Sequence, residues 1–443
     1  YFLMITLFFL NVINAQEISS SLKLEFNPTN NNYWWLENNN YGKSILDKEL
    51  HYKFEFKTSK TTYLLNISNA YQSFDYSIDE NILHPISGQL QIGKKIPEEK
   101  IYFGEFFIKH DFSNNLFLRA GKYYRDFSLY LNDDLSSGSM LISKNAQPMP
   151  KIGLVGEYAL LRNKNISFSY GIAHGLFKKN NYYEKAPYLH EKFIYLNLKK
   201  KSSILSIGFV HEAMWGGSSP IFGDFPSSFK DFLKIMISAD GPKEGSRLDN
   251  PDWHINALGN HLGIWDFSYQ KVDKNKKMKA YYQHFFEDTS SLRFANGIDG
   301  LWGLELENYL HQKTILFEYM DTSNAYLDPP YQSDRYYWNY QYRLGWSYQG
   351  NIIGNPYVNA NRVDDTSSKE FKELTKLFHI GIKGAIKSTL DYSILASKRI
   401  NINDNINYKI SIRKKITNNL NFNLSIMSGS SRGGFSGGME YIF

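Results

Sequence analysis

The chain has 443 residues, enough for two or three soluble domains or for one large β-barrel, because a barrel grows by adding strands to a single sheet. Aromatic residues make up 16% of it, and cysteine is absent, which excludes disulfides, thiolate metal sites and a cysteine nucleophile. The net charge is +6 with acidic and basic residues interspersed, so there is no basic stripe of the kind that binds nucleic acid.

The first segment is predicted to be a secretory signal peptide, residues 1–15, which leaves residues 16–443 as a single domain. The segment is strongly apolar, and the small residue Ala15 stands directly before polar Gln16. No positively charged region precedes the apolar run, so we expect the start of the signal to be truncated. A short buried helix is the alternative.

Many later segments alternate apolar and polar residues, which is the period of a β-strand. Residues 166–173, 408–413 and 420–426 alternate in this way, with small or polar residues on one face. Such a face suits a wide, wet lumen better than a packed soluble core. Residues 339–348 alternate most regularly, and ten residues suffice for a tilted strand to cross a bilayer. We expect their apolar face, which includes Tyr340, Tyr342, Leu344 and Trp346, to contact lipid.

The connections fall into two classes, which is typical of membrane barrels with long loops outside the cell. Short turns are predicted at residues 199–202, 273–276 and 417–419. The long insertions are rich in Pro, Gly and Asn, and they cover about residues 28–48, 77–100, 124–151, 212–260, 322–336 and 351–372. One helix is predicted within residues 227–239, where Phe229, Phe232, Leu233 and Met236 recur at helical spacing. This helix would cap or line the mouth of a barrel or lie on its surface.

The last strand ends flush with an aromatic residue, and Met439, Tyr441 and Phe443 share one face. This ending is typical of outer-membrane barrels, although a soluble β-protein can also end in Phe. We therefore predict an all-β fold: a transmembrane antiparallel β-barrel of about 18 strands in the outer membrane, with both ends of the barrel chain periplasmic. Outer-membrane lipid and the barrel-insertion machinery are the partners that such a fold requires.

Several blocks of sequence resemble the Wzi-like capsule assembly family. The most specific block is residues 138–150, Gly-Ser-Met-Leu-Ile-Ser-Lys-Asn-Ala-Gln-Pro-Met-Pro. Other blocks follow in family order at residues 211–220, 226–232, 296–303 and 350–356. Two positions depart from the family pattern. Gln147 stands where the family has Arg, and the run from Arg125 to Tyr130 replaces a Trp-Gly-Pro-Gly-like run.

The resemblance implies a lectin-like barrel that binds capsular or other surface polysaccharide and helps to assemble or attach it, without catalysis. Sugar binding needs flat rings for stacking and planar polar groups for hydroxyls. The candidate glycan-binding residues are Arg125, Lys144, Asn145, Gln147, His211, Glu212 and Trp215. The alternative reading is that these residues brace an inward-folded loop, and that Trp215 belongs to an aromatic girdle.

Catalytic signatures are missing from the sequence. His211-Glu212 is not a His-Glu-x-x-His motif, and there is no Gly-x-Ser-x-Gly elbow. The acidic pairs Asp364-Asp365 and Glu287-Asp288 are adjacent in sequence, so on a strand they would point to opposite faces. We therefore expect no catalytic residue, cofactor or metal. The main functional alternative is an outer-membrane porin or substrate-selective channel, which would need a continuous wet path.

Overall fold

The computed structural model describes most of the chain. The described residues are 17–27, 34–43, 48–71, 78–83, 90–95, 101–160, 163–180, 182–241, 257–287, 289–310, 313–324, 336–339, 341–358, 375–401, 405–428 and 433–443. The expected signal segment, residues 1–15, lies outside them. Within the described residues, no helix is both long and apolar enough to cross a membrane.

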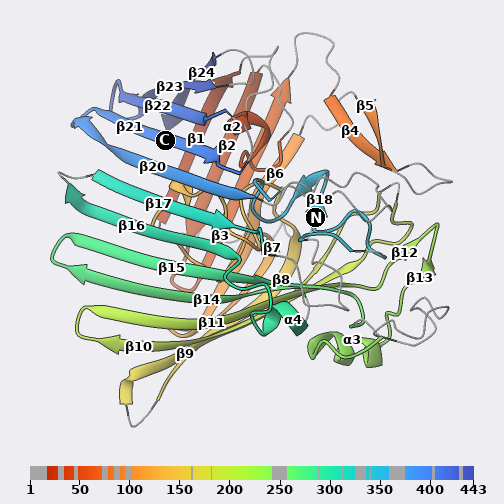
Figure 1. The fold of residues 1–443 in the computed structure, drawn as a ribbon. Coiled ribbons are helices and arrows are strands. Elements are labelled where there is room, and N and C mark those ends of the chain that lie inside the picture. Colours follow the sequence, from red (N-terminus) through yellow and green to blue (C-terminus); the bar gives the residue numbers. More distant parts are fainter. Residues whose placement is uncertain are drawn as a thin grey trace.

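Eighteen antiparallel strands form one sheet that closes on itself (Figure 1). Each strand pairs with the next along the chain, and β24 pairs back onto β1, with Leu22 opposite Tyr441. The eighteen strands are β1 (Glu17–Phe26), β2 (Lys48–Lys57), β3 (Thr61–Tyr71), β6 (Ile101–Ser113), β7 (Leu116–Lys122), β8 (Pro150–Leu160), β9 (Asn163–Leu176), β10 (Tyr188–Lys200), β11 (Ser203–Trp215), β14 (Asn260–Asp273), β15 (Lys276–Phe286), β16 (Gly300–Leu310), β17 (Lys313–Asp321), β20 (Lys376–Lys387), β21 (Leu390–Arg399), β22 (Asn407–Lys415), β23 (Leu420–Ser428) and β24 (Gly433–Ile442). The prediction of an antiparallel barrel of about 18 strands is confirmed.

Alternation along the strands separates the two faces of the wall. In β9, Tyr170 and Ile172 are exposed on the outside of the barrel, while Ala173, which directly follows Ile172, is buried on the inside. In β23, Phe422 and Ile426 are likewise exposed on the outside. Because every strand is paired on both sides, the wall leaves no open sheet edge, which is the condition for a sheet to stand in lipid.

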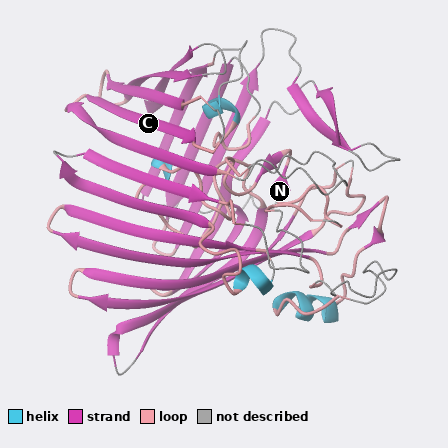
Figure 2. Ribbon diagram, in the orientation of Figure 1, coloured by secondary structure: helices cyan, strands magenta, loops and turns pink. Residues whose placement is uncertain are grey.

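The two ends of the barrel differ in the length of their connections (Figure 2). At one end, tight turns join the strands, and the turns predicted at residues 199–202, 273–276 and 417–419 lie there. Phe443 also lies at this short-turn end, where its backbone N–H donates to the carbonyl of Ser20 over 3.0 Å. All the long connections emerge at the opposite end, which we call the long-connection end.

The long connections carry small elements of their own. These are α2 (Trp34–Glu37), α3 (Phe229–Met236), α4 (Thr289–Leu292) and the strand pairs β4 (Ile78–Leu83) with β5 (Leu90–Lys95), β12 (Ser218–Ser219) with β13 (Gly223–Asp224), and β18 (Ser347–Tyr348) with β19 (Asn351–Ile352). The helix predicted from residues 227–239 is α3. It starts with a capping box, in which the Ser228 side chain accepts from the Asp231 N–H and the Asp231 carboxylate accepts from the Ser228 N–H.

The prediction of a lipid-facing strand at residues 339–348 is wrong. Tyr340 lies outside the described residues, but Tyr342 and Trp346 are only 2% and 0% exposed, and both belong to the interior of the β17–β20 connection. Gly345 has φ +57°, and its N–H donates to the Tyr342 carbonyl over 2.7 Å, so the chain turns here. The alternation reflects aromatic residues packed inside irregular turns, which a period of two cannot distinguish from a strand.

Candidate functional site: a lumen plug and the barrel mouth

The connection between β7 and β8, residues 123–149, folds into the lumen, and we call it the plug. Its Leu131 and Asn132 N–H groups each donate over 2.8 Å to the Glu305 carboxylate on β16. Further along, the carbonyl of Leu135 accepts a 2.6 Å hydrogen bond from His379 Nε2 on β20. β20 lies half way round the 18-strand barrel from β7, so the plug crosses the full width of the lumen.

The plug contains one 3₁₀ turn, Asp133–Leu135, and is otherwise irregular throughout residues 123–149, all of which the structure describes. Buried irregular backbone needs acceptors from elsewhere, because it cannot form a ladder of its own. Glu318 on β17 supplies them: its carboxylate accepts from Ser136 Oγ and the Ser137 N–H, each over 2.7 Å, and from Tyr281 OH over 2.5 Å. The wall therefore fixes the plug through a few acidic side chains.

Arg125 and Lys144 lie within the plug and form ion pairs with its own acidic residues. Arg125 donates to Asp133 Oδ1 over 2.6 Å and to the Ile142 carbonyl over 2.8 Å, while Lys144 pairs with Asp134 and, at 3.8 Å, with Asp133. Burial acts to lower the pKa of the Arg125 guanidinium, but the neighbouring Asp133 carboxylate, together with Tyr130 and Tyr195, outweighs burial and raises it. Burial likewise acts to raise the pKa of Asp133, but Arg125 and Lys144 outweigh it and lower that pKa.

Asn145 and Gln147 join the plug to two other long connections. Asn145 accepts from the Asn39 N–H over 3.0 Å and donates from Nδ2 to the Ile352 carbonyl over 2.9 Å. Gln147 Nε2 donates to the Gly42 carbonyl over 3.3 Å. Both side chains are buried, so the amide groups that would suit sugar hydroxyls are engaged in holding three connections together.

The other three predicted site residues do not form one site. They lie where β11 reaches the long-connection end of the barrel: His211, Glu212 and Trp215. Glu212 faces the lumen opposite Glu191, and among the described residues neither of its carboxylate oxygens has a hydrogen-bond partner. His211 and Trp215 face outward: His211 Nε2 lies 2.9 Å from His261 Nδ1, and the Trp215 ring packs beside Tyr188 at 5.0 Å. Strand alternation thus separates residues that are close in sequence.

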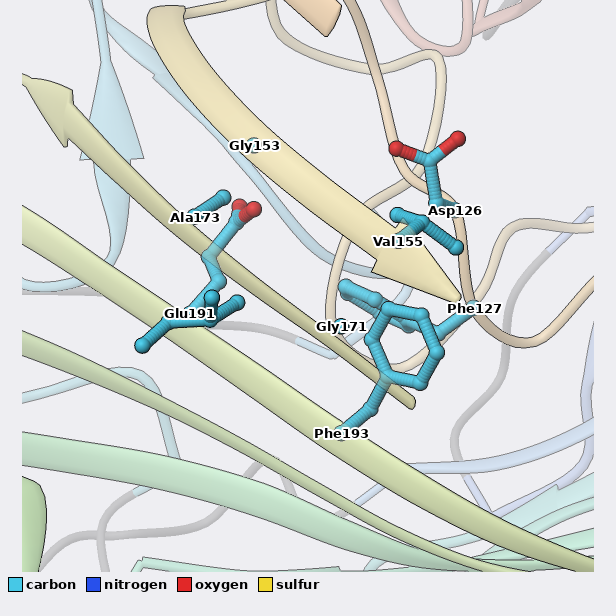
Figure 3. Close-up of a pocket in the computed structure, with 9 residues that line it drawn as sticks. Asp126, Phe127, Gly153, Val155, Gly171, Ala173, Glu191 and Phe193 are labelled. Atoms are coloured by element: carbon cyan, nitrogen blue, oxygen red, sulfur yellow. The ribbon is translucent and has the colours of Figure 1, made fainter. Parts of the chain in front are cut away.

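A small pocket lies between the start of the plug and strands β8–β10 (Figure 3). Asp126 and Phe127 of the plug line one side, and Glu191 and Phe193 of β10 line the other. Its cavity volume is about 10 Å³, which is room for about one water molecule. A sugar ring cannot enter a space of that size, so the pocket is a packing gap between plug and wall rather than a sugar site.

Three long connections converge at the mouth, and sequence reasoning missed their meeting point. Tyr182 OH donates to the Gln341 carbonyl over 2.7 Å, and the rings of Phe225 and Tyr342 lie 4.7 Å apart. The guanidinium of Arg343 stands 5.4 Å over the ring of Phe222, and both side chains are partly exposed. We call Tyr182, Phe222, Phe225, Tyr342 and Arg343 the mouth cluster.

The acidic anchors of the plug were also missed, although the sequence carries a signal for them. Glu305 lies between Leu304 and Leu306, and Glu318 between Phe317 and Tyr319, so each is a charge on the inward face of a strand with large apolar residues directly before and after it. In a wet lumen such a position is unremarkable. It becomes informative only if an irregular segment is expected inside the barrel, because that segment needs acceptors.

Comparisons with known proteins agree with this architecture. A family model described as capsule assembly protein Wzi matches residues 68–371. The solved structure of Wzi from Escherichia coli, described as an outer-membrane protein involved in group 1 capsule assembly and as a carbohydrate-binding β-barrel, is similar with a TM-score of 0.61. It is 14% identical, and the alignment covers 100% of this chain and 87% of that one.

The alignment with a mutant porin of Rhodopseudomonas blastica covers 96% of this chain and 99% of the porin chain. Its TM-score of 0.38 and identity of 8% are too low to support any argument. No curated protein sequence matches the chain. The family match and the 18-strand barrel establish an outer-membrane protein, whose long-connection end is extracellular by the usual barrel pattern. Because the family model covers well over half of the sequence, the chain belongs to the Wzi capsule assembly family.

Proposed function

We propose that this protein binds capsular or related surface polysaccharide at its extracellular mouth, without catalysis, and helps to assemble or attach that polysaccharide at the cell surface. Family membership supports the class of ligand, since the similar barrel from Escherichia coli is described as binding carbohydrate.

The plug is the observation that carries the proposal. A porin or substrate-selective channel needs a continuous wet path, whereas here residues 123–149 reach from β7 to the opposite strand β20. They are fastened on the way at Glu305 and Glu318. A barrel closed in this way suits a surface that presents a binding face to the outside better than it suits transport.

We propose the two partly exposed members of the mouth cluster, Phe222 and Arg343, as the main contact surface for glycan. Phe222 offers a ring that can stack on a sugar face, and Arg343 offers planar N–H donors for hydroxyl or carboxylate groups. Beside them, Lys185 and Asp224 form an exposed ion pair at 2.9 Å, which adds exchangeable polar groups at the same rim. Both aromatic and polar chemistry are thus presented to the outside.

The residues proposed from sequence enter this function in different ways. Lys144 keeps 23% of its side chain exposed and remains a candidate for contact with an acidic glycan. We propose that Arg125, Asn145 and Gln147 position the mouth by bracing the plug. Glu212 is buried on the lumen side of the wall without a hydrogen bond to the described part of the plug, and we assign it no contact with glycan. His211 and Trp215 lie on the outer face of the wall, away from the lumen. Whether Trp215 contacts glycan is tested by Trp215→Ala, with retention of capsule at the cell surface as the readout.

The binding test uses purified protein in detergent and the capsular polysaccharide of the source strain. Phe222→Ala and Arg343→Ala should each weaken binding about tenfold, which corresponds to about 1.4 kcal/mol. Phe294→Ala is the matched control, since Phe294 is an exposed aromatic residue of another extracellular connection whose ring stacks on outward-facing His284. Wild-type protein that conducts ions freely in planar bilayers and binds no polysaccharide would instead support the channel alternative.

Membrane insertion adds two further partners, outer-membrane lipid and the barrel-insertion machinery. We propose that β24 and Phe443 form the segment recognised during insertion, since Tyr441 and Phe443 are exposed on the outer face with rings 4.9 Å apart. Deleting Phe443 should reduce the amount of heat-modifiable protein in the outer membrane. Unchanged amounts would remove Phe443 from this role.

A further inference from the structure

The helix α3 lies on the outer side of the barrel wall, at its extracellular rim. In β10, Glu191 points into the lumen and pairs with Lys151 at 2.7 Å, so its neighbours His190 and Lys192 point outward. The Phe232 ring of α3 packs on His190 with ring centroids 5.6 Å apart. Figure 1 shows α3 beside the ends of β9–β11 at the long-connection end.

Two further contacts fasten α3 to the wall. Ile235 is fully buried in a cluster with the outward-facing Ala213 and with Leu258. At the other end, Lys192 Nζ donates to the carbonyl of Met236, where a cation complements the negative end of the helix dipole. The helix is therefore attached to the outer face of the barrel rather than extending freely into solvent.

The wall covers only part of the apolar surface of α3. Phe229, Leu233 and Ile237 follow one another at four-residue spacing and so lie on one side of the helix. They are 75%, 50% and 77% exposed. Lys230 and Lys234 lie on the adjacent polar side. Three large apolar residues that are exposed side by side form an apolar patch, and such a patch marks a surface that contacts an apolar partner.

The position of α3 identifies that partner. Directly below Lys192 on the same outward face of β10, Ile194 is exposed and belongs to the lipid-facing belt of the wall. α3 is fastened at the next outward position of the same strand, where Lys192 donates to the Met236 carbonyl, so the helix lies at the rim end of this belt. We propose that α3 is an interfacial helix, with Phe229, Leu233 and Ile237 inserted among the acyl chains of the outer leaflet and its lysines at headgroup level. This is the arrangement of an amphipathic helix lying in a membrane surface.

This placement has a consequence for the mouth. The connection that carries α3 also carries Phe222 and Phe225 of the mouth cluster. An α3 inserted in the outer leaflet would fix one flank of that connection relative to the membrane surface. The inference concerns lipid contact and stands whether or not the mouth binds glycan.

The chain has no cysteine, so single cysteines can carry an environment-sensitive fluorophore. Ile237→Cys is the test position. Ile194→Cys is the lipid-facing reference, and Ile221→Cys, an exposed isoleucine between β12 and β13 of the same connection, is the matched control outside the membrane. Each labelled protein is checked for heat-modifiability and reconstituted into phosphatidylcholine–phosphatidylglycerol vesicles with ordinary or brominated acyl chains.

The label at residue 237 should be quenched by brominated chains at least half as strongly as the label at residue 194, and should be shielded from aqueous iodide. The label at residue 221 should show the reverse. If the label at residue 237 behaves like that at residue 221, or is protected from both quenchers, α3 does not insert in lipid and the proposal is overturned.

Discussion

The wall and the plug are built from the same chain but satisfy their backbone groups in opposite ways. Each wall strand hydrogen-bonds to two neighbouring strands. Its backbone N–H and C=O groups are therefore paired largely independently of the identity of its side chains. The plug has a single 3₁₀ turn and takes acceptors from side chains of the wall, above all Glu305 and Glu318. The wall is therefore specified by a repeating pattern, and the plug by a few particular residues.

This difference predicts different responses to substitution. A single change on the wall meets a redundant ladder, and it matters mainly if it places charge in lipid. A single change at an anchor of the plug leaves buried donors without acceptors, and the plug has no alternative pairing. The predictions below test that contrast, beginning with the largest expected effect.

Replacing Glu318 with leucine should have the largest effect on the plug. Ser137 N–H and the hydroxyls of Ser136 and Tyr281 would lose their acceptor while still buried. At about 1–3 kcal/mol for each of these three unsatisfied groups, the plug should be destabilised by about 3–9 kcal/mol relative to the wall. We expect Glu318→Leu to form a heat-modifiable barrel that conducts ions in planar bilayers.

Glu307→Leu is the matched control for that experiment. Glu307 lies on the inward face of neighbouring β16, but its carboxylate pairs with Lys277 of the wall at 3.2 Å and not with the plug. Its variant should stay closed. Equal conductance in both variants, or none in Glu318→Leu, would show that the plug does not depend on its acidic anchor.

The loss of barrel stability on substitution in the wall should depend on whether the position faces lipid or the lumen, more than on which residue is replaced. Ile207 of β11 is exposed on the outer face, and adjacent Ser206 faces the lumen, where its hydroxyl donates to Asn197 over 2.7 Å. Ile207→Arg should destabilise the barrel by about 2–4 kcal/mol if it lies near the bilayer midplane, while an arginine in the lumen is tolerated far better. Urea unfolding in lipid vesicles measures both, and a larger loss for Ser206→Arg would reverse our assignment of the two faces.

The same contrast explains what the sequence could and could not predict. Strands such as β9 and β23 were predictable because period-two alternation is local, and the turn at residues 199–202 because turn residues are local too. The run at residues 339–348 shows the limit: its aromatic residues alternate, yet they pack inside a connection around Tyr342 and Trp346. Alternation reports which residues are apolar but not whether lipid or protein covers them.

The candidate site shows that limit more strongly. Family blocks drew attention to the plug segment and to the end of β11, but the roles of these residues depend on contacts distant in sequence. Asn145 meets Ile352, and Ser137 meets Glu318, across the lumen. The mouth cluster joins residues from three connections, and no spacing within one segment could have indicated that Phe222 lies beneath Arg343.

The smallest expected effect concerns pH and the part of the rim around Asp299, where the β15–β16 and β17–β20 connections meet. Asp299, just before β16, accepts from the N–H and Nδ2 of Asn324, each over 3.0 Å, and from Tyr336 OH over 2.7 Å. Burial raises the pKa of Asp299 to about 6 despite these hydrogen bonds. Between its ordinary pKa near 3.8 and about 6, the folded rim binds a proton that the opened rim does not, so lowering the pH through this window stabilises the folded rim.

From pH 7 to pH 5 the gain should be about 1 kcal/mol. Hydrogen exchange of the Asn324 amide, corrected for the intrinsic effect of pH, should therefore be several-fold slower at pH 5 than at pH 7. Asp299→Asn cannot titrate and should show no such difference, although its baseline protection will change with its altered hydrogen bonds. Slower exchange at pH 7 than at pH 5 in the wild-type protein would mean that the ionised carboxylate holds the rim more firmly than the protonated one. The contacts of Asp299 with Asn324 and Tyr336 would then outweigh the cost of burying its charge.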